Sequence, residues 1–176
     1  FCKFTNETRN GIEDSSENSG QRFITVVNGT AAGGGYELAL ATDHIIMADD
    51  GSAAVALPEV PLLAVLPGTG GLTRVVDKRK VRRDHADFFC TIEEGIKGKR
   101  AVAWRLVDEL APNSKLEAKI AERAGEFAAK SSRKGSGKGI SLSSLQRTVD
   151  ESGLRYGFVT VDINREQRTA TLTIAA

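Results

Sequence analysis

A glycine-rich turn between a buried strand and an apolar helix most constrains how this chain can fold. Residues Phe23–Val27 are apolar or β-branched, a composition typical of a buried strand. Gly33, Gly34 and Gly35 follow, and the mostly apolar run Tyr36–Thr42 then predicts a helix. Glycines let another group approach the backbone closely and leave free N–H groups at the helix start. Such donors can hold a developing oxyanion, although tight packing of helix on strand is the more common reason for such glycines.

Strands and helices alternate along residues 1–130, which indicates an α/β domain. His44–Ala48 predicts a second strand, and helices are expected at Phe1–Ser16, from Gly71 through Val76, and at about 80–90, 98–107 and 114–130. Residues 131–155 begin with a stretch rich in Ser, Gly and Lys and are assigned to a linker. Strand-like runs at 156–163 and 169–174 indicate the first strands of a second region over residues 156–176.

Composition narrows the classes of function that this chain can serve. A formal net charge of +1 gives no reason to expect nucleic acid or an anionic membrane as the main partner. No apolar run approaches the roughly 20 residues of a membrane span. The two cysteines, Cys2 and Cys90, lack metal-type spacing and suit a reducing compartment, so we expect the cytoplasm. The chain starts at Phe1 and stops inside a strand-like run, and we therefore expect a piece of a longer protein.

Two glutamates are the strongest candidates for chemistry. Glu37 falls in the first turn of the apolar helix, where the helix dipole favours a carboxylate for purely structural reasons. Glu59 follows Pro58 among apolar residues, where a carboxylate is rarely left without a partner or a task. Two carboxylates in one low-dielectric pocket have pKa values that move apart, which leaves one as base and the other as acid. Spacing alone does not prove that they share a pocket.

The other reactive side chains have simpler explanations. Cys2 and Cys90 are more typical of small core residues than of nucleophiles. Neither His44 nor His85 is accompanied by a Ser or Cys in the pattern of a catalytic triad, which favours structural or surface roles for both. The basic cluster at 78–83 is usually a solvated helix face, but it could bind the phosphates of a cofactor such as CoA or of RNA.

Two sequence blocks, Val27–Asp43 and Leu57–Arg74, resemble the signature blocks of the crotonase (enoyl-CoA hydratase/isomerase) superfamily, and Gly98–Asp108 resembles the segment that follows them. The resemblance covers about residues 20–130. It implies an α/β fold made as a crotonase-type spiral of ββα units with a C-terminal helical region, incomplete at its N-terminus. It also implies that residues 156–176 begin a second crotonase-like region.

The same resemblance implies roles for named residues. Gly34, beside Gly33, would give an oxyanion-hole N–H to a thioester carbonyl, and Glu37 and Glu59 would take the positions of the two catalytic glutamates. The usual second oxyanion donor would lie upstream of residue 1, so we expect no activity from this chain alone.

A narrower resemblance, over Phe1–Asp14, Pro58–Arg74, Asp77–Asp84 and Phe89–Thr91, points to the lyases of this superfamily that act on an aromatic acyl-CoA. It implies that water opens the ring of 2,3-epoxy-2,3-dihydrobenzoyl-CoA to an adipyl-CoA semialdehyde and formate, in aerobic benzoate degradation. Cys2 would be a third pocket residue. We expect no cofactor, because CoA is part of the substrate, and no metal site.

The partners expected are an acyl-CoA substrate and further copies of the chain in a homo-oligomer, with no nucleic acid and no membrane. Two alternatives stay open: an ordinary enoyl-CoA hydratase or isomerase, and a non-catalytic crotonase-fold module that binds CoA esters or RNA.

Overall fold

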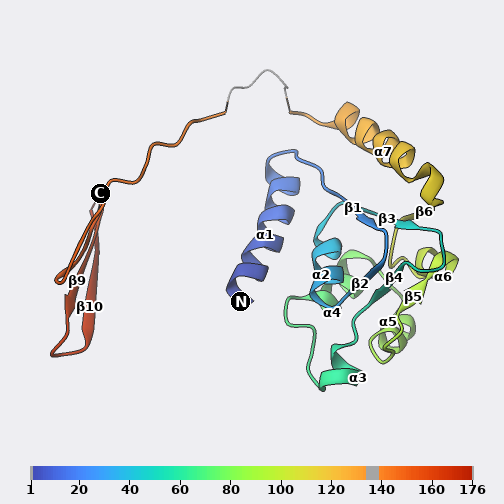
Figure 1. The fold of residues 1–176 in the computed structure, drawn as a ribbon, viewed down its shortest axis with the longest axis horizontal. Coiled ribbons are helices and arrows are strands. Elements are labelled where there is room, and N and C mark those ends of the chain that lie inside the picture. The colour runs from blue at the N-terminus through green and yellow to red at the C-terminus, as the bar shows by residue number, and fades with distance from the viewer. Residues whose placement is uncertain (1, 134–138, 176) are drawn as a thin grey trace. The chain divides into compact units, whose positions relative to one another are not determined.

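The computed structural model describes residues 2–133 and 139–175, and for Cys2 the backbone alone. These residues form two compact units, Phe1–Lys134 and Gly135–Ala176. Each unit is described by itself, and the first one contains the residues that the sequence picks out for chemistry (Figure 1).

The first unit repeats a strand–strand–helix motif. In order along the chain its first elements are α1 (Cys2–Asn18), β1 (Ile24–Val27), β2 (Thr30–Ala32), α2 (Gly34–Ala41), β3 (His44–Ala48), β4 (Ala54–Ala56) and α3 (Glu59–Leu63). The first strand of each repeat joins one sheet, where β1 pairs in parallel with β3. The second strand of each repeat joins another sheet, where β2 pairs in parallel with β4. The chain therefore spirals, and each turn of the spiral ends in a helix.

A third turn completes both sheets. Its elements are α4 (Gly71–Thr73), the π-helix η1 (Arg74–Lys78), α5 (Arg83–Phe89), β5 (Ile96–Lys97), α6 (Gly98–Ala103), β6 (Glu109–Ala111), the 3₁₀-helix η2 (Asn113–Lys115) and α7 (Leu116–Lys130). Strand β5 pairs antiparallel with β4, and β6 pairs in parallel with β3. The resulting strand orders are β1-β3-β6 and β2-β4-β5.

The core lies where α2 packs between the strands and the later helices. Tyr36, on α2, is fully buried and its hydroxyl donates a 2.7 Å hydrogen bond to the Leu106 carbonyl. Its ring meets Phe89 of α5 edge to face, with centroids 5.7 Å apart. Helix α1 packs beside α2 (Figure 1). These contacts fix the position of the first turns of α2, the part of the helix that carries Gly34 and Glu37.

Some element boundaries differ from the sequence prediction. The short strand β2 lies in the stretch between Val27 and Gly33 that the sequence shows as a glycine-rich turn, and it exists because β4 supplies its hydrogen-bond partner. The helix predicted over 98–107 ends at Ala103, because Arg105 has φ +62° and turns the chain towards β6.

The second unit is an antiparallel sheet in the order β10-β9-β8-β7. Its strands are β7 (Thr148–Asp150), β8 (Gly153–Arg155), β9 (Val159–Asn164) and β10 (Thr169–Ile174). The strands predicted at 156–163 and 169–174 correspond to β9 and β10. The prediction of a linker over 131–155 was wrong at its end, because β7 and β8 pair through a turn closed by Asp150. Residues 134–138 of that linker lie outside the described residues.

Candidate active site

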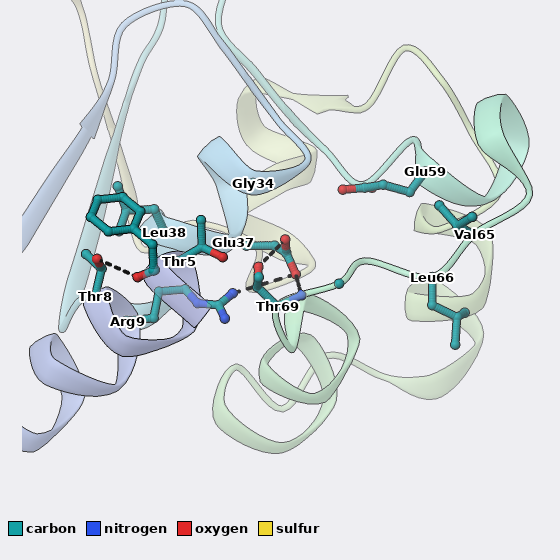
Figure 2. A pocket seen from close by; sticks show the side chains of 12 residues that line it. Thr5, Thr8, Arg9, Gly34, Glu37, Leu38, Glu59, Val65, Leu66 and Thr69 are labelled. Carbon is teal, nitrogen blue, oxygen red and sulfur yellow. Dashed lines mark hydrogen bonds and ion pairs between the residues drawn. The ribbon is translucent and has the colours of Figure 1, made fainter. Parts of the chain in front are cut away.

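A cavity of about 410 Å³ lies where α1, the start of α2, α3 and the loop before α4 meet (Figure 2). Its polar lining comes from four different elements and consists of Thr5, Thr8, Arg9, Glu37, Glu59 and Thr69. Glu37 and Glu59 both line this one cavity, as the shared-pocket hypothesis requires.

Glu37 is held from several sides. Its side chain is only 3% exposed, and its Oε1 accepts hydrogen bonds from the amides of Thr69, at 3.0 Å, and Gly71, at 2.9 Å. The Thr69 hydroxyl donates to the other oxygen, Oε2. These three donors engage both oxygens of the carboxyl group. Glu37 is therefore an anchored carboxylate with one fixed orientation.

The Thr69–Gly71 turn fits tightly around Glu37. Gly70 has φ +82°, and a Cβ there would lie 2.6 Å from Nη1 of Arg74. A Cβ on Gly71 would lie 3.0 Å from Cγ and Oε1 of Glu37. Arg74 in turn donates to the Thr69 carbonyl at 3.0 Å and pairs with Glu13 of α1 through both ends of the carboxylate. The turn that anchors Glu37 is thus itself tied to α1.

Arg9 is the least expected residue of the site. Its side chain comes from α1 and is 2% exposed, and its Nη1 lies 3.8 Å from Oε1 of Glu37. Its Nη2 donates to the side chain of Asn6 at 2.5 Å, but Nε and Nη1 have no hydrogen-bond partner among the described residues. Burial, and next the positive charge of Arg74, lower the pKa of Arg9, while the carboxylates of Glu37 and Glu13 raise it.

Glu59 lies in the opposite kind of environment. It is the first residue of α3, and its Oε2 is buried with no hydrogen-bond partner in the described part of the chain. Its carboxyl group points towards the end of α2 that carries Gly34 and Glu37 (Figure 2). Burial raises the pKa of Glu59 above its ordinary value, and the Glu37 carboxylate raises it further. The Glu59 carboxyl group thus keeps its proton to a higher pH than an ordinary glutamate does.

The two glycines predicted for oxyanion binding differ. The Gly33 amide donates a 3.0 Å hydrogen bond to the carbonyl of Ala56 in β4, so this amide is already used within the protein. Gly33 has φ +54°, and a Cβ there would lie 2.8 Å from Oε1 of Glu59, so the position needs glycine. Gly34, the first residue of α2, is exposed to the cavity, and its amide has no acceptor among the described residues. Of the two, only the Gly34 N–H is available to a ligand.

The rest of the cavity lining is largely apolar. Its apolar lining consists of Phe4, Leu38, Val65 and Leu66, and Phe4 and Leu66 are 71% and 69% exposed. Large apolar side chains left open to solvent around a pocket suit an apolar ligand group better than a charged one. The arrangement can hold an apolar group against two carboxyl groups and one free backbone donor.

Other residues considered in the sequence lie elsewhere. The Cys2 side chain is outside the described part of the chain, so its pocket role stays a prediction. Cys90 is buried and does not line the cavity, and burial raises its thiol pKa to about 11. His44 bonds Glu109 at 2.9 Å, and His85 stacks on Trp104, which fits the structural roles predicted for both.

The basic cluster at 78–83 is largely occupied by internal partners. Lys78 bonds Glu13 and the Ala41 carbonyl, and Arg79 bonds Asp108. Arg82 pairs with Asp84. These pairs explain the cluster structurally and weaken the RNA-binding alternative.

Sequence reasoning missed Arg9 and Thr69. Arg9 is spaced four residues from Thr5 and three from Ile12, which places it on the inner face of α1. A charged residue on the inner face of a helix is unusual, and this position could have marked Arg9 as a candidate site residue. Thr69 gave none, because its importance depends on how the loop returns to α2.

Comparison with known proteins identifies the family and the fold. The sequence model described as enoyl-CoA hydratase/isomerase matches residues 16–136, which is more than half of the chain. The chain therefore belongs to the enoyl-CoA hydratase/isomerase, or crotonase, family. The predicted crotonase-type α/β fold is confirmed by solved structures. One of them is an enoyl-CoA hydratase from Geobacillus kaustophilus, with 34% identity and a TM-score of 0.63 over 73% of this chain and 46% of that one.

Two more relatives place the chain within the family. A carnitinyl-CoA hydratase from Mycobacterium avium is 33% identical, with a TM-score of 0.52 over 61% of this chain and 41% of that one. A protein named benzoyl-CoA-dihydrodiol lyase, from Aromatoleum evansii, is 60% identical over all 176 residues. The chain spans 32% of the length of that lyase. In the described part of the chain, no helix is both long and apolar enough to cross a membrane.

Proposed function

We propose that this chain carries catalytic residues of a benzoyl-CoA-dihydrodiol lyase, which opens the ring of 2,3-epoxy-2,3-dihydrobenzoyl-CoA. The observation that carries the proposal is a pair of unlike carboxyl groups, Glu37 and Glu59, on one cavity with a free backbone N–H. The 60% identity to a lyase of that name supports this reaction over others in the family.

The thioester carbonyl binds at the start of α2 in this proposal. The Gly34 N–H, unpaired among the described residues, donates to the carbonyl oxygen. A donor fixed in advance stabilises negative charge where it develops, without reorganisation during the reaction. Gly34 supplies one such donor from this chain.

Glu37 acts as the base. Its carboxyl group is fixed in orientation by Thr69 and Gly71, so it is placed to accept a proton from a water molecule in the cavity. The oxygen of that water attacks a carbon of the epoxide as its proton passes to Glu37.

Glu59 acts as the acid. Its raised pKa favours the protonated form of the group that faces the cavity, and the C–O bond of the epoxide breaks as this proton reaches the leaving oxygen. C–C cleavage with a second water molecule then gives an unsaturated adipyl-CoA semialdehyde, which keeps one C=C bond, and formic acid. The atoms of the epoxide and two waters balance those of the products, no electrons enter or leave, and the mechanism uses no metal or redox cofactor.

The apolar residues of the cavity lining contact the six-membered ring in this proposal. Phe4, Leu38 and Leu66 offer contacts to a flat hydrocarbon group. Burial of an apolar ring stabilises binding by about 25 cal/mol per Å² of surface removed from water.

The test uses a protein of the lyase's full length that contains this chain. Formate release from the epoxide is measured for the wild type and for Glu37→Gln and Glu59→Gln. We expect each variant to turn over at least about 10²-fold more slowly, because each removes one acid–base group. Full formate release by both variants would contradict the proposal.

Ordinary hydration is the second candidate, favoured by the 34% identity to an enoyl-CoA hydratase. Crotonyl-CoA is assayed beside the epoxide in the same preparation. Faster turnover of crotonyl-CoA would favour the hydratase. Tight CoA-ester binding without turnover of either compound would favour a non-catalytic module.

A further inference from the structure

Arg9 carries two donors that no group of the described chain uses. Its Nε and Nη1 are both buried without a hydrogen-bond partner, although the residue lines the cavity. A buried charged donor left unpaired costs more than a neutral one, which itself costs about 1–3 kcal/mol. Such a group persists in a folded protein when something else satisfies it.

Glu37 does not satisfy these donors. Its Oε1 lies 3.8 Å from Nη1 of Arg9, beyond hydrogen-bond distance, and already accepts from Thr69 and Gly71. Glu13 is the other carboxylate whose charge acts on Arg9, and it is occupied by Arg74 and Lys78. Glu59 also faces the cavity, and its pKa is raised. Neither Glu37 nor Glu13 thus accepts a hydrogen bond from Nε or Nη1 of Arg9, and both donors can bind an oxygen atom of a ligand.

We propose that Arg9 is a specificity-determining residue that binds an oxygen atom carried on the ring of the acyl group. Figure 2 shows its guanidinium group at the polar end of the cavity, beside Glu37 and Thr69. This inference rests on the proposed function, because the epoxide oxygen is the ligand atom that distinguishes this substrate from a hydrocarbon acyl chain.

The consequence is discrimination by an unpaired donor. A substrate with a ring oxygen completes the hydrogen bonding of Arg9, whereas a substrate without one fills the cavity and leaves the buried donors unpaired. Sites built to hydrogen-bond a substrate group reject analogues that lack it far more strongly than apolar pockets reject a change in size. Arg9 would thus separate this chain's substrate from those of a hydratase with the same two glutamates.

As the epoxide opens, the electrons of the broken C–O bond go to its oxygen. Arg9 stabilises the negative charge that develops on that oxygen while the proton of Glu59 reaches it, with no change in the atoms exchanged. Arg9 neither gives nor takes a proton.

The experiment compares unreactive ligands that differ by one ring oxygen. Binding of 2-hydroxybenzoyl-CoA, 3-hydroxybenzoyl-CoA and benzoyl-CoA is measured calorimetrically on a protein of the lyase's full length that contains this chain. We expect at least one hydroxylated ligand to bind about 10- to 100-fold more tightly than benzoyl-CoA. Arg9→Met should abolish the difference, so that no hydroxylated ligand binds more tightly than benzoyl-CoA.

Two further variants separate recognition from folding. Arg9→Lys keeps the buried charge but loses Nε–H, so we expect it to keep only part of the preference. Arg82→Met removes an arginine whose side chain is 70% exposed and which does not line the cavity, and we expect it to bind like the wild type. If Arg9→Met does not fold, an undiminished preference in Arg9→Lys overturns the inference.

The two proposals fail in different ways. A wild type that prefers hydroxylated ligands but releases no formate from the epoxide would contradict the proposed function and leave Arg9 as the oxygen-binding group. Formate release together with an unchanged ligand preference in Arg9→Met would contradict the Arg9 inference alone. Equal affinity of the wild type for all three ligands would also contradict it.

Discussion

The two sides of the cavity are built differently, although each carries a glutamate. On the side of α2 and the Thr69–Gly71 turn, Glu37 has three hydrogen-bond donors and a nearby arginine. On the side of α3, the Oε2 of Glu59 has no hydrogen-bond partner in the described chain, and apolar side chains flank the loop that follows. The difference teaches that two carboxyl groups on one cavity can have very different hydrogen-bonding surroundings although the residue type is the same.

The largest expected effect follows from removing each carboxyl group in turn. Glu37→Ala leaves buried donors of Thr69 and Gly71 and the charge of Arg9 uncompensated, so we expect a loss of about 3–5 kcal/mol in the free energy of unfolding. Glu59→Ala removes a group with an unpaired oxygen and should change it by less than about 1 kcal/mol. Denaturant unfolding followed by fluorescence of Trp104, the single tryptophan, measures both. Equal losses of unfolding free energy in Glu37→Ala and Glu59→Ala would contradict the difference between the two sides of the cavity.

Thr69→Val tests the anchored side with a smaller change. The substitution keeps the shape and the amide of residue 69 but removes the hydroxyl that donates to Glu37. Hydrogen bonds to charged groups contribute about 1.5–3 kcal/mol, and we expect a loss in this range. The exposed Thr73→Val serves as the control and should unfold like the wild type. A Thr69→Val protein as stable as the wild type would show that the amides alone fix Glu37.

Gly33→Ala tests the side of Glu59. A Cβ at φ +54° is strained, and it would lie 2.8 Å from the Glu59 carboxyl, so we expect a loss of about 1–2 kcal/mol. At Gly35 no atom lies within 4 Å of an added Cβ, and Gly35→Ala should therefore be neutral or slightly stabilising. Comparing the thermal unfolding of the two variants removes effects common to any added methyl group.

The smallest effect is a pH dependence. The pKa of Glu59 is raised in the folded chain, so stability falls as pH rises from the ordinary value of 4.5 through the folded value, and is constant above it. Glu59→Gln does not titrate at this position. We expect its stability relative to the wild type to increase as pH rises across this window. An unchanged difference between the two proteins from pH 4 to pH 8 would contradict the raised pKa.

The sequence supports much of the fold because its strongest signals are local. Strand β3 and helix α7 follow directly from runs of apolar residues and helical spacing, and both match the prediction closely. Strand β2 could not be predicted, since its three residues become a strand only by pairing with β4. Strands β7 and β8 were missed for a similar reason, because their short and mostly polar segments depend on partners within the sheet.

The residues of the site also fall into those that local sequence predicts and those that depend on contacts between distant segments. Glu37, Glu59 and Gly34 follow from motif and apolar surroundings, because each belongs to a local signal. The burial of Arg9 depends on α1 packing beside α2, and sequence spacing gives only its face of the helix. The occupied amide of Gly33 depends on the Ala56 carbonyl, which reaches it through the pairing of β2 with β4. Contacts between distant segments are thus what the sequence left open.

The most direct measurement is a carbon-13 NMR titration of the Glu59 carboxyl group, in the wild type and in Glu37→Gln. We predict that Glu59 titrates above 4.5 in the wild type and at a lower pH in Glu37→Gln, because the neighbouring negative charge is gone. Titration of Glu59 at or below 4.5, with no response to Glu37→Gln, would contradict the division of acid and base across this cavity.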